Sequence, residues 1–345
     1  MSDIDVAQAV AQDDLVIPLI DFSAFLSGTP AQKSQTAQAI LNGFQTAGFI
    51  YLSNHAIPAS TISSVFANSA KFFARPQEQK DALSWYSPEA NRGYSGYGRE
   101  KVSLPDEDKG DVEKLRAVPD LKESLEVGRE GEEGMPNMWP PVDGDEDAKT
   151  FKDVMLSFHD TCKDLHMQLM RAIALGMGLD STWFDGFTDG GDNTLRLLHY
   201  PGVPKKVFQR ADGQLQVRAG EHSDYGSLTL LFQDERGGLQ VRSPKGTFVN
   251  ATPIPGTIVI NAGDLLARWS NDTIKSTKHR VVEPPPKVDS GDKETYPPRY
   301  SVAYFCNPNF ERLIEALPGT YEGSGKKYEG IRSGEYLVKR LTATY

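Results

Sequence analysis

The chain has 345 residues, of which 39% are hydrophobic and 24% are charged, a composition that excludes collagen, coiled coils and wholesale disorder. Its 37 basic and 47 acidic residues give a net charge of −10, which argues against a generic binder of nucleic acids or anionic membranes. We find no apolar run of membrane-spanning length and no secretory signal, so we expect a cytoplasmic protein with neither membrane nor nucleic-acid partners. Two cysteines, Cys162 and Cys306, form no disulfide or metal-binding motif.

The first half of the chain predicts alternating strands and helices after a disordered arm at residues 1–15. Apolar spacing predicts strands at 17–21 and 49–52 and helices at 32–47 and 62–73. Residues 86–149 are rich in Gly, Pro, Asp and Glu and show little periodicity. A segment of this kind is typical either of a lid that faces the substrate or of an acidic surface linker.

The second half predicts a β core behind one long helix. Apolar residues that step by three and four predict an amphipathic helix over 151–177. Short strands are predicted at 195–199, 228–232, 239–241, 258–261, 280–283 and 300–305, and a final helix at 333–341. Such strands with Gly and Pro turns predict a β-sandwich or jelly roll, so the fold class is mainly β with flanking helices. We expect residues 16–150, an N-terminal region, and 151–345, the long helix and β core, to form one integrated unit.

Three residues suggest a metal site. His222 and Asp224 are two positions apart just before a predicted strand, so their side chains point to the same side of the extended chain. His279 precedes another predicted strand. Two histidines and one carboxylate form the facial triad of non-haem Fe(II) oxygenases, which leaves three metal positions open for a chelating co-substrate and dioxygen.

An arginine and a serine on a later strand suggest a carboxylate site. Arg299 and Ser301 share one face of a predicted strand, and the arginine fork can bind a carboxylate with two hydrogen bonds. A second Arg-x-Ser motif lies at 268–270, before His279 and in a predicted loop or turn. We therefore prefer the later motif.

These motifs, in this order, resemble the Fe(II)/2-oxoglutarate-dependent dioxygenases of the isopenicillin-N-synthase-like branch. Residues 17–23 and 48–55 are similar to the N-terminal signature of the branch, and the resemblance covers residues 16–344. It implies a double-stranded β-helix (jelly roll) in which His222, Asp224 and His279 bind Fe(II).

The resemblance also implies the co-substrates. Arg299, Ser301 and Tyr200 would bind the distal carboxylate of 2-oxoglutarate, and O2 would be the oxidant, with ascorbate as an activator. The reaction implied is hydroxylation of a C–H bond with release of succinate and CO2. Two departures from the family pattern are Leu198, where many members have Asn, and an extra segment at 284–298.

The candidate substrate residues suggest a small, flat substrate. Tyr225 follows Asp224, and Phe305 lies on the strand face of Arg299, so two rings could sandwich a planar molecule. Arg196 and Asn193 could hydrogen-bond to the edges of a heterocycle. Core packing of the rings and a structural ion pair for Arg196 remain the alternatives.

Residues 90–95, 98–102 and 265–272 resemble fungal members of the branch, especially the thymine 7-hydroxylases. Those enzymes oxidise the methyl group of thymine stepwise to 5-hydroxymethyluracil, 5-formyluracil and 5-carboxyuracil. The resemblance implies thymine as the substrate and adds Tyr94 and Arg99 as pocket candidates. Three alternatives remain open: the same chemistry on a fungal natural-product intermediate, an iron oxidase that does not use 2-oxoglutarate, and a non-catalytic jelly-roll binding protein.

Overall fold

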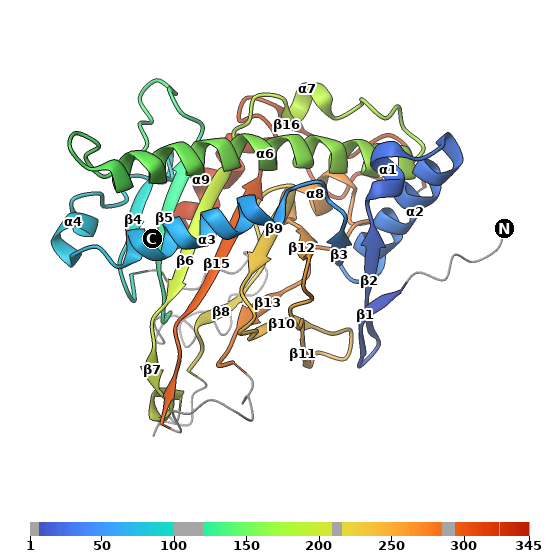
Figure 1. Ribbon diagram of the computed structural model, residues 1–345. Helices are drawn as coiled ribbons and strands as arrows, with labels where there is room; N and C mark the ends of the chain where they lie inside the picture. The colour runs from blue at the N-terminus through green and yellow to red at the C-terminus, as the bar shows by residue number, and fades with distance from the viewer. Residues whose placement is uncertain (1–6, 100–119, 209–215, 285–293, 324, 345) are drawn as a thin grey trace.

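The computed structural model describes residues 7–99, 120–208, 216–284, 294–323 and 325–344 (Figure 1). In the described residues the larger sheet has nine strands, and all neighbours are antiparallel except β2 and β3. In sheet order these are β1 (Gln8–Gln12), β2 (Leu15–Asp21), β3 (Phe49–Ser53), β12 (Thr257–Ala262), β9 (Leu228–Gln233), β15 (Arg299–Cys306), β6 (Thr194–Tyr200), β5 (Glu123–Gly128) and β4 (Gly93–Ser95).

A smaller sheet faces part of the larger one. Its strands are β11 (Phe248–Asn250), β10 (Leu239–Arg242), β13 (His279–Val281) and β8 (Ala219–His222). Apolar side chains from both sheets, among them Leu198, Val241, Val259 and Val281, form one buried cluster. Two sheets that pack through such a shared core form a jelly roll, which confirms the fold class expected from the sequence.

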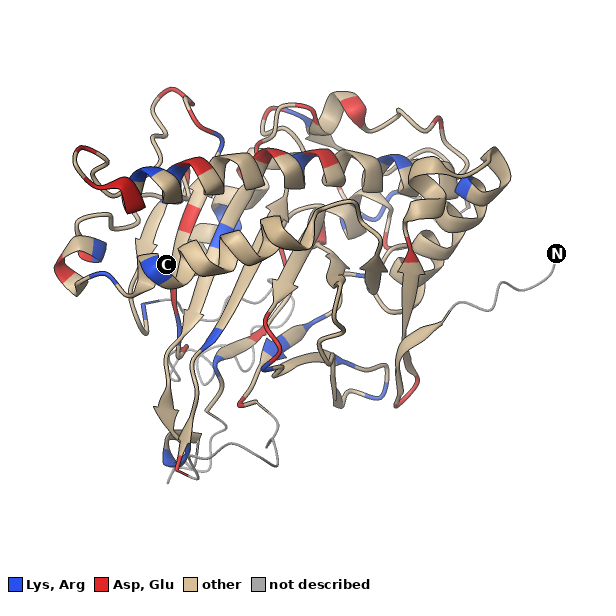
Figure 2. Ribbon diagram, in the orientation of Figure 1, with Lys and Arg blue, Asp and Glu red and all other residues tan. Residues whose placement is uncertain are grey.

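Helices cover the other face of the larger sheet. The principal ones are α2 (Pro30–Thr46), α3 (Ala59–Phe73) and α6 (Glu146–Gly176), and α3 and α6 lie across β6 and β15 (Figure 1). The buried side of α6 is apolar except for two histidines, His159 and His166, whereas acidic and basic residues follow one another along its exposed side (Figure 2). Its N-terminus is capped by Asp145, whose Oδ1 accepts a 2.9 Å hydrogen bond from the Ala148 amide. This amphipathic helix therefore covers a second hydrophobic core, which lies between the larger sheet and the helices.

The remaining elements are short, apart from the C-terminal helix α9 (Ser333–Thr344). They are α1 (Ser23–Ser27), α4 (Gln77–Asp81), α7 (Asp185–Thr188), α8 (Asp264–Trp269), the 3₁₀ turn η2 (Lys205–Phe208), and the paired strands β7 (Val203–Pro204) with β14 (Thr295–Tyr296) and β16 (Leu313–Ile314) with β17 (Ile331–Arg332). None of the helices in the described ranges combines the length and apolar character that a membrane crossing requires.

The prediction of a disordered arm at residues 1–15 is wrong for residues 8–15. The strand β1 pairs with β2 through a tight turn in which Asp13 and Asp14 have φ values of 53° and 64°. Aspartate is less common than glycine in this left-handed region, so the sequence carried a weak turn signal. Residues 1–6 lie outside the described residues.

The segment expected to act as a lid, residues 86–149, is partly built into the sheet. Its strands β4 and β5 extend the larger sheet beyond β6, and residues 100–119 lie outside the described residues. Of the extra segment at 284–298, residues 285–293 also lie outside the described part, while β14 pairs with β7. The lid function therefore stays a prediction for this segment.

Candidate active site

The three predicted metal ligands come together between the two sheets. The strand β8 ends at His222, β13 begins at His279, and these residues are direct partners across the two strands. Asp224 lies in the turn that follows β8, and its Oδ1 is 3.8 Å from Nε2 of each histidine. All three ligand atoms lie within 4.8 Å of one another. This spacing suits three ligands on one face of a single metal ion.

Backbone carbonyls set the orientation of both imidazole rings. The Nδ1 atom of His222 lies 2.8 Å from the Gly220 carbonyl oxygen, and Nδ1 of His279 lies 3.2 Å from that of Thr277. A carbonyl oxygen only accepts, so Nδ1 carries the proton and the lone pair is on Nε2. Both Nε2 atoms therefore face Asp224 in the form that binds a metal.

One oxygen of Asp224 is occupied by protein donors. Its Oδ2 accepts hydrogen bonds from Oγ1 of Thr229 at 2.5 Å and from Nδ2 of Asn261 at 2.7 Å. Burial raises the pKa of Asp224, but the positive charges available to His279 and His222 and these two hydrogen bonds outweigh burial and lower it overall. The carboxylate is therefore held ionised, with Oδ1 directed at the histidines.

Burial keeps His222 neutral. Burial, with a further contribution from the charge of His279, lowers the pKa of His222 to about 4. A neutral imidazole beside an ionised carboxylate is the protonation state that a divalent metal requires. The donor set of two imidazoles and one carboxylate, with no thiolate, fits Fe(II).

A buried arginine lies deeper between the sheets. Arg299 is 1% exposed, pairs across the sheet with Tyr200, and has its guanidinium 4.9 Å from the centre of that ring. Its Nε donates to the Gly237 carbonyl oxygen at 2.9 Å, and its Nη1 donates to Oγ of Ser301 at 3.2 Å. The structure thus brings together Arg299, Ser301 and Tyr200, as the sequence predicts. The alternative Arg268 lies on α8 against Tyr328, and its Nη2 donates to the Glu329 carbonyl oxygen.

A second buried arginine, Arg218, was not singled out in the sequence. It is 1% exposed and lies 5.9 Å from the Tyr200 ring centre, on the residue before β8. Its Nη2 donates to the Pro297 carbonyl oxygen at 3.1 Å, but Nε and Nη1 have no hydrogen-bond partner among the described residues. Burial, followed by repulsion from Arg299, lowers the pKa of Arg218 to about 10. Two neighbouring buried guanidiniums are strongly stabilised when an anion binds to them.

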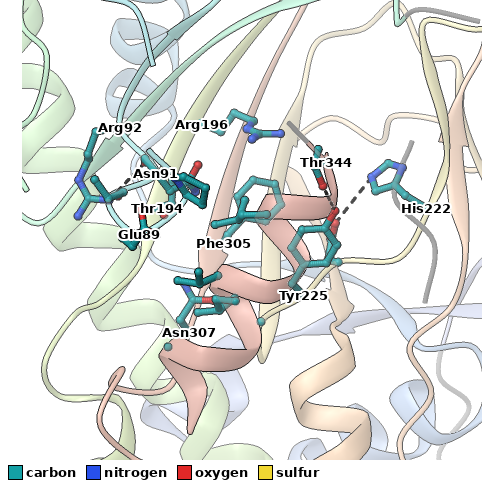
Figure 3. Close-up of a pocket in the computed structure, with 18 of the residues that line it drawn as sticks. Glu89, Asn91, Arg92, Thr194, Arg196, His222, Tyr225, Phe305, Asn307 and Thr344 are labelled. Atoms are coloured by element: carbon teal, nitrogen blue, oxygen red, sulfur yellow. Dashed lines mark hydrogen bonds and ion pairs between the residues drawn. The ribbon is translucent and has the colours of Figure 1, made fainter. Parts of the chain in front are cut away.

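A cavity of about 320 Å³ opens beside the metal triad. Arg196 and Phe305 line one side of it, and Tyr225, Thr344 and His222 line the other (Figure 3). Its volume lies at the lower end of the ~300–1,000 Å³ range of small-molecule sites. Both aromatic candidates and the arginine therefore line the same cavity as His222 and Asp224.

The Arg196 guanidinium is fixed by a residue that the sequence analysis did not select. Its Nε lies 2.6 Å from Oε1 of Glu126, which is fully buried on the adjacent strand β5. Ser124 donates to the same Oε1 at 2.9 Å, and the guanidinium lies 5.3 Å from the Phe305 ring centre. The ion pair that was an alternative to substrate binding is present, yet Arg196 also lines the cavity.

Asn193 does not line the cavity. Its Nδ2 donates to the Tyr304 hydroxyl at 2.9 Å, and its Oδ1 accepts from the Asn307 amide at 2.8 Å, so the side chain ties two strands together. Asn193 is an odd number of residues from Arg196 and faces the other way, whereas Thr194 and Asn307 do line the cavity.

Tyr94 and Arg99 also lie apart from the residues that line this cavity. The Tyr94 hydroxyl donates to Oε2 of Glu123, and the Arg99 Nη2 donates to the Trp85 carbonyl oxygen at 3.2 Å. Both side chains therefore have structural partners. Residues 88–92 of the same segment do line the cavity, as a substrate-facing segment would.

Comparison with known proteins gives the family. Residues 17–142 match the family described as "non-haem dioxygenase in morphine synthesis N-terminal", and residues 191–308 match the "2OG-Fe(II) oxygenase superfamily". A 2-oxoglutarate-Fe(II) type oxidoreductase of Metarhizium rileyi is 35% identical over 94% of this chain and 90% of its own length. A 2-oxoglutarate-dependent dioxygenase of Glarea lozoyensis is 34% identical over 96% of this chain and all of its own.

Solved structures agree with this result. The crystal structure of full-length Neurospora crassa thymine 7-hydroxylase with 2-oxoglutarate and thymine is 60% identical, covers 98% of this chain and 100% of that chain, and has a TM-score of 0.89. The same enzyme with 5-formyluracil is 58% identical, covers 98% and 99%, and has a TM-score of 0.87. The chain therefore belongs to the 2OG-Fe(II) oxygenase superfamily and is a 2-oxoglutarate-dependent dioxygenase that uses Fe(II), 2-oxoglutarate and O2.

Proposed function

We propose that this dioxygenase oxidises the methyl group of thymine, first to 5-hydroxymethyluracil and then to 5-formyluracil and 5-carboxyuracil. The observation that carries the proposal is the cavity that Tyr225, Phe305 and Arg196 line together with two of the proposed metal ligands, His222 and Asp224. The 60% identity to an enzyme crystallised with thymine, and the complex of the same enzyme with 5-formyluracil, support both the substrate and the stepwise oxidation.

In this proposal His222, Asp224 and His279 hold Fe(II) through the two Nε2 atoms and Oδ1. The carbonyls of Gly220 and Thr277 fix the rings, and Thr229 and Asn261 fix the carboxylate, so these residues position the ligands. When bound there, Fe(II) and 2-oxoglutarate supply the activation of O2, with release of succinate and CO2.

The distal carboxylate of 2-oxoglutarate binds to Arg299 and Ser301 beside Tyr200, and Arg218 completes the site. The carboxylate would satisfy the unpaired Nε and Nη1 of Arg218 and would separate two guanidiniums that otherwise repel each other. Leu198 lies on the same strand face as Tyr200 and leaves this part of the site apolar apart from these donors.

Thymine stacks between Tyr225 and Phe305. The guanidinium of Arg196, held in place by Glu126, donates to a ring carbonyl of the base. Asn307 lines the cavity, and its buried Oδ1, which has no hydrogen-bond partner among the described residues, would accept a ring N–H. A pyrimidine offers both a carbonyl and an N–H on its edge, which matches this donor and acceptor.

A second candidate is the same chemistry on a natural-product intermediate. It is favoured by a curated relative, the proline hydroxylase of Petromyces alliaceus, which is 33% identical over 94% of this chain. The oxidase that does not use 2-oxoglutarate, and the non-catalytic binding protein, have no support from the family match. The cytoplasmic location and the absence of nucleic-acid and membrane partners stay predictions.

The test is succinate release from 2-oxoglutarate with Fe(II), ascorbate and air, with and without thymine, followed by mass analysis of the products. A large thymine-dependent rise is expected, and Asp224→Ala is expected to remove it while the protein stays folded. A small succinate signal that thymine leaves unchanged would transfer the proposal to natural-product substrates. Retained turnover in Asp224→Ala would overturn the metal site.

A further inference from the structure

The C-terminal helix α9 forms one wall of the substrate cavity. Leu337, Val338, Leu341 and Thr344 of this helix all line it. Oγ1 of Thr344 lies 2.7 Å from the hydroxyl of Tyr225, the ring on which the base is proposed to stack (Figure 3). The last turn of the chain therefore contacts the stacking ring directly.

Arg340 of the same helix packs on that ring from behind. Its guanidinium lies 4.2 Å from the centre of the Tyr225 ring. Tyr225 lines the substrate cavity, whereas Arg340 lines a separate groove of the molecule, so the ring lies between the guanidinium and the cavity. Nε and Nη2 of Arg340 have no hydrogen-bond acceptor among the described residues, and the side chain is 6% exposed. The ring face is thus the contact that this part of the guanidinium makes.

The other end of the Arg340 guanidinium is bound by Asp264. Nη1 of Arg340 donates to Oδ2 of Asp264 and, at 3.0 Å, contacts the Tyr336 hydroxyl. The same carboxylate accepts from Oγ of Ser223 at 3.1 Å and from Oγ of Ser276 at 2.6 Å. One half-buried carboxylate therefore joins α9 to the two segments that carry the proposed metal ligands.

The backbone reinforces this junction. The amide of Asp264 donates to the Asp224 carbonyl oxygen at 2.8 Å, and the amide of Leu265 donates to that of Tyr225 at 3.1 Å. These amides belong to the first turn of α8, where they have no partner inside the helix. The turn between His222 and Tyr225 is thus held from one side by α8 and from the other by α9.

We propose that Asp264 and Arg340 are positioning residues for substrate binding. Arg340 holds the Tyr225 ring in its stacking orientation, and Asp264 locks Arg340 to the loops of His222 and His279. These contacts fix the position of the stacking ring relative to the metal site. The proposal rests on the proposed stacking of the base on Tyr225.

The test compares thymine binding by calorimetry in protein loaded with Mn(II) and 2-oxoglutarate. Arg340→Leu is expected to raise the Kd for thymine about tenfold, from loss of a desolvated cation–π contact and of ring order. The Kd for 2-oxoglutarate is expected to change less than about twofold. Lys339→Ala, an exposed cation on the same helix, is the matched control and is expected to leave both constants unchanged.

A double-mutant cycle separates positioning from general structure. If Arg340 acts through the ring, Arg340→Leu adds less than about twofold in a Tyr225→Ala background, because the group it positions is gone. An unchanged thymine Kd in Arg340→Leu, or an equal effect in both backgrounds, overturns the proposal. Circular dichroism and thermal melting check the fold. If Arg340→Leu does not fold, Asp264→Asn decides, because it removes the charge that holds Arg340 and keeps the shape of the side chain. The expected rise in Kd is about threefold, and a wild-type value is the contrary result.

Hydrogen exchange tests whether α9 is coupled to residues 223–226, and this test does not depend on the identity of the substrate. Arg340→Leu is expected to speed amide exchange in residues 223–226 as well as in α9, and Lys339→Ala in neither. Faster exchange confined to α9 overturns the coupling. Failure of the wild-type protein to bind thymine, by contrast, overturns the proposed substrate. The exchange experiment then still tests the coupling between α9 and residues 223–226.

Discussion

Asn261 donates a 2.7 Å hydrogen bond to Oδ2 of Asp224 and is the direct partner of Thr229, the second donor to that oxygen, across β12 and β9. The register of two central strands therefore determines which carboxylate oxygen stays available. Oδ1, the remaining oxygen, is the atom 3.8 Å from both histidines. The pairing of β12 with β9 therefore orients the carboxylate for metal binding, although neither strand carries a proposed ligand.

Replacing Asn261 should weaken metal binding without removing a ligand. Asn261→Ala is expected to lower the affinity for Fe(II) about 10- to 100-fold, because the carboxylate loses the donor that fixes its orientation. Co(II) titration followed by absorbance measures this directly. Asn250→Ala, at an exposed position on β11, is the control and should match the wild type. Wild-type affinity in Asn261→Ala would show that Thr229 alone suffices.

Both buried arginines should contribute to binding of 2-oxoglutarate, whereas Arg218 should not stabilise the fold. Arg299→Met and Arg218→Met are both expected to raise the KM for 2-oxoglutarate at least about tenfold, since each removes a donor to a charged carboxylate. Without co-substrate, Arg218→Met should leave the melting temperature unchanged or raise it, because a buried charge with unpaired N–H groups is removed.

Arg242→Met, an exposed arginine paired with Glu221, is the matched control for both measurements. An unchanged KM in Arg218→Met would place the distal carboxylate on Arg299 and Ser301 alone. A large fall in melting temperature would instead give Arg218 a structural role.

The sequence predicted residues whose chemistry is carried by local spacing. His222 with Asp224, and Arg299 with Ser301, are two apart on extended chain, so alternation alone places each pair on one face. The same rule explains the error at Asn193, three residues before Arg196, which faces away and ties Tyr304 to Asn307.

Residues that act through partners far away in the chain could not be predicted in this way. Glu126, Asn261 and Asp264 meet Arg196, Asp224 and Arg340 only because strands and helices distant in sequence become neighbours. No local pattern marks a buried acid as the partner of a particular arginine. The β1 hairpin was missed for a different reason, since its Asp13-Asp14 turn lacks the glycine that usually signals positive φ.

The buried histidine of α6 predicts an acid sensitivity that is independent of the metal. Burial lowers the pKa of His166 to about 3, while an unfolded chain titrates near the ordinary value of 6.5. Between these values the unfolded state binds the proton and the folded state does not, so the free energy of unfolding falls as the pH falls. From pH 7 to pH 5 the loss from this group is about 2 kcal/mol.

Urea unfolding of chelator-treated protein at pH 7 and pH 5 measures this loss, and His166→Gln should reduce the difference between the two pH values. The residual slope would come from His55, His159 and His222, whose pKa values burial also lowers. An identical slope in the variant would mean that His166 takes up the proton in the folded state as readily as in the unfolded state.

Glu126 should control substrate affinity although it lies behind Arg196, the residue that is proposed to contact the base. Its carboxylate is fully buried, 2.6 Å from Nε of Arg196, and Ser124 donates to the same oxygen. Glu126→Gln keeps the shape of the side chain but removes the charge that orients the guanidinium. The KM for thymine is expected to rise about tenfold, the KM for 2-oxoglutarate to stay within about twofold, and kcat to fall less than KM rises. Glu130→Gln, the same change at an exposed acid paired with Lys152, is the control. If both KM values rose equally in Glu126→Gln, the buried acid would be holding β5 against β6 rather than orienting Arg196.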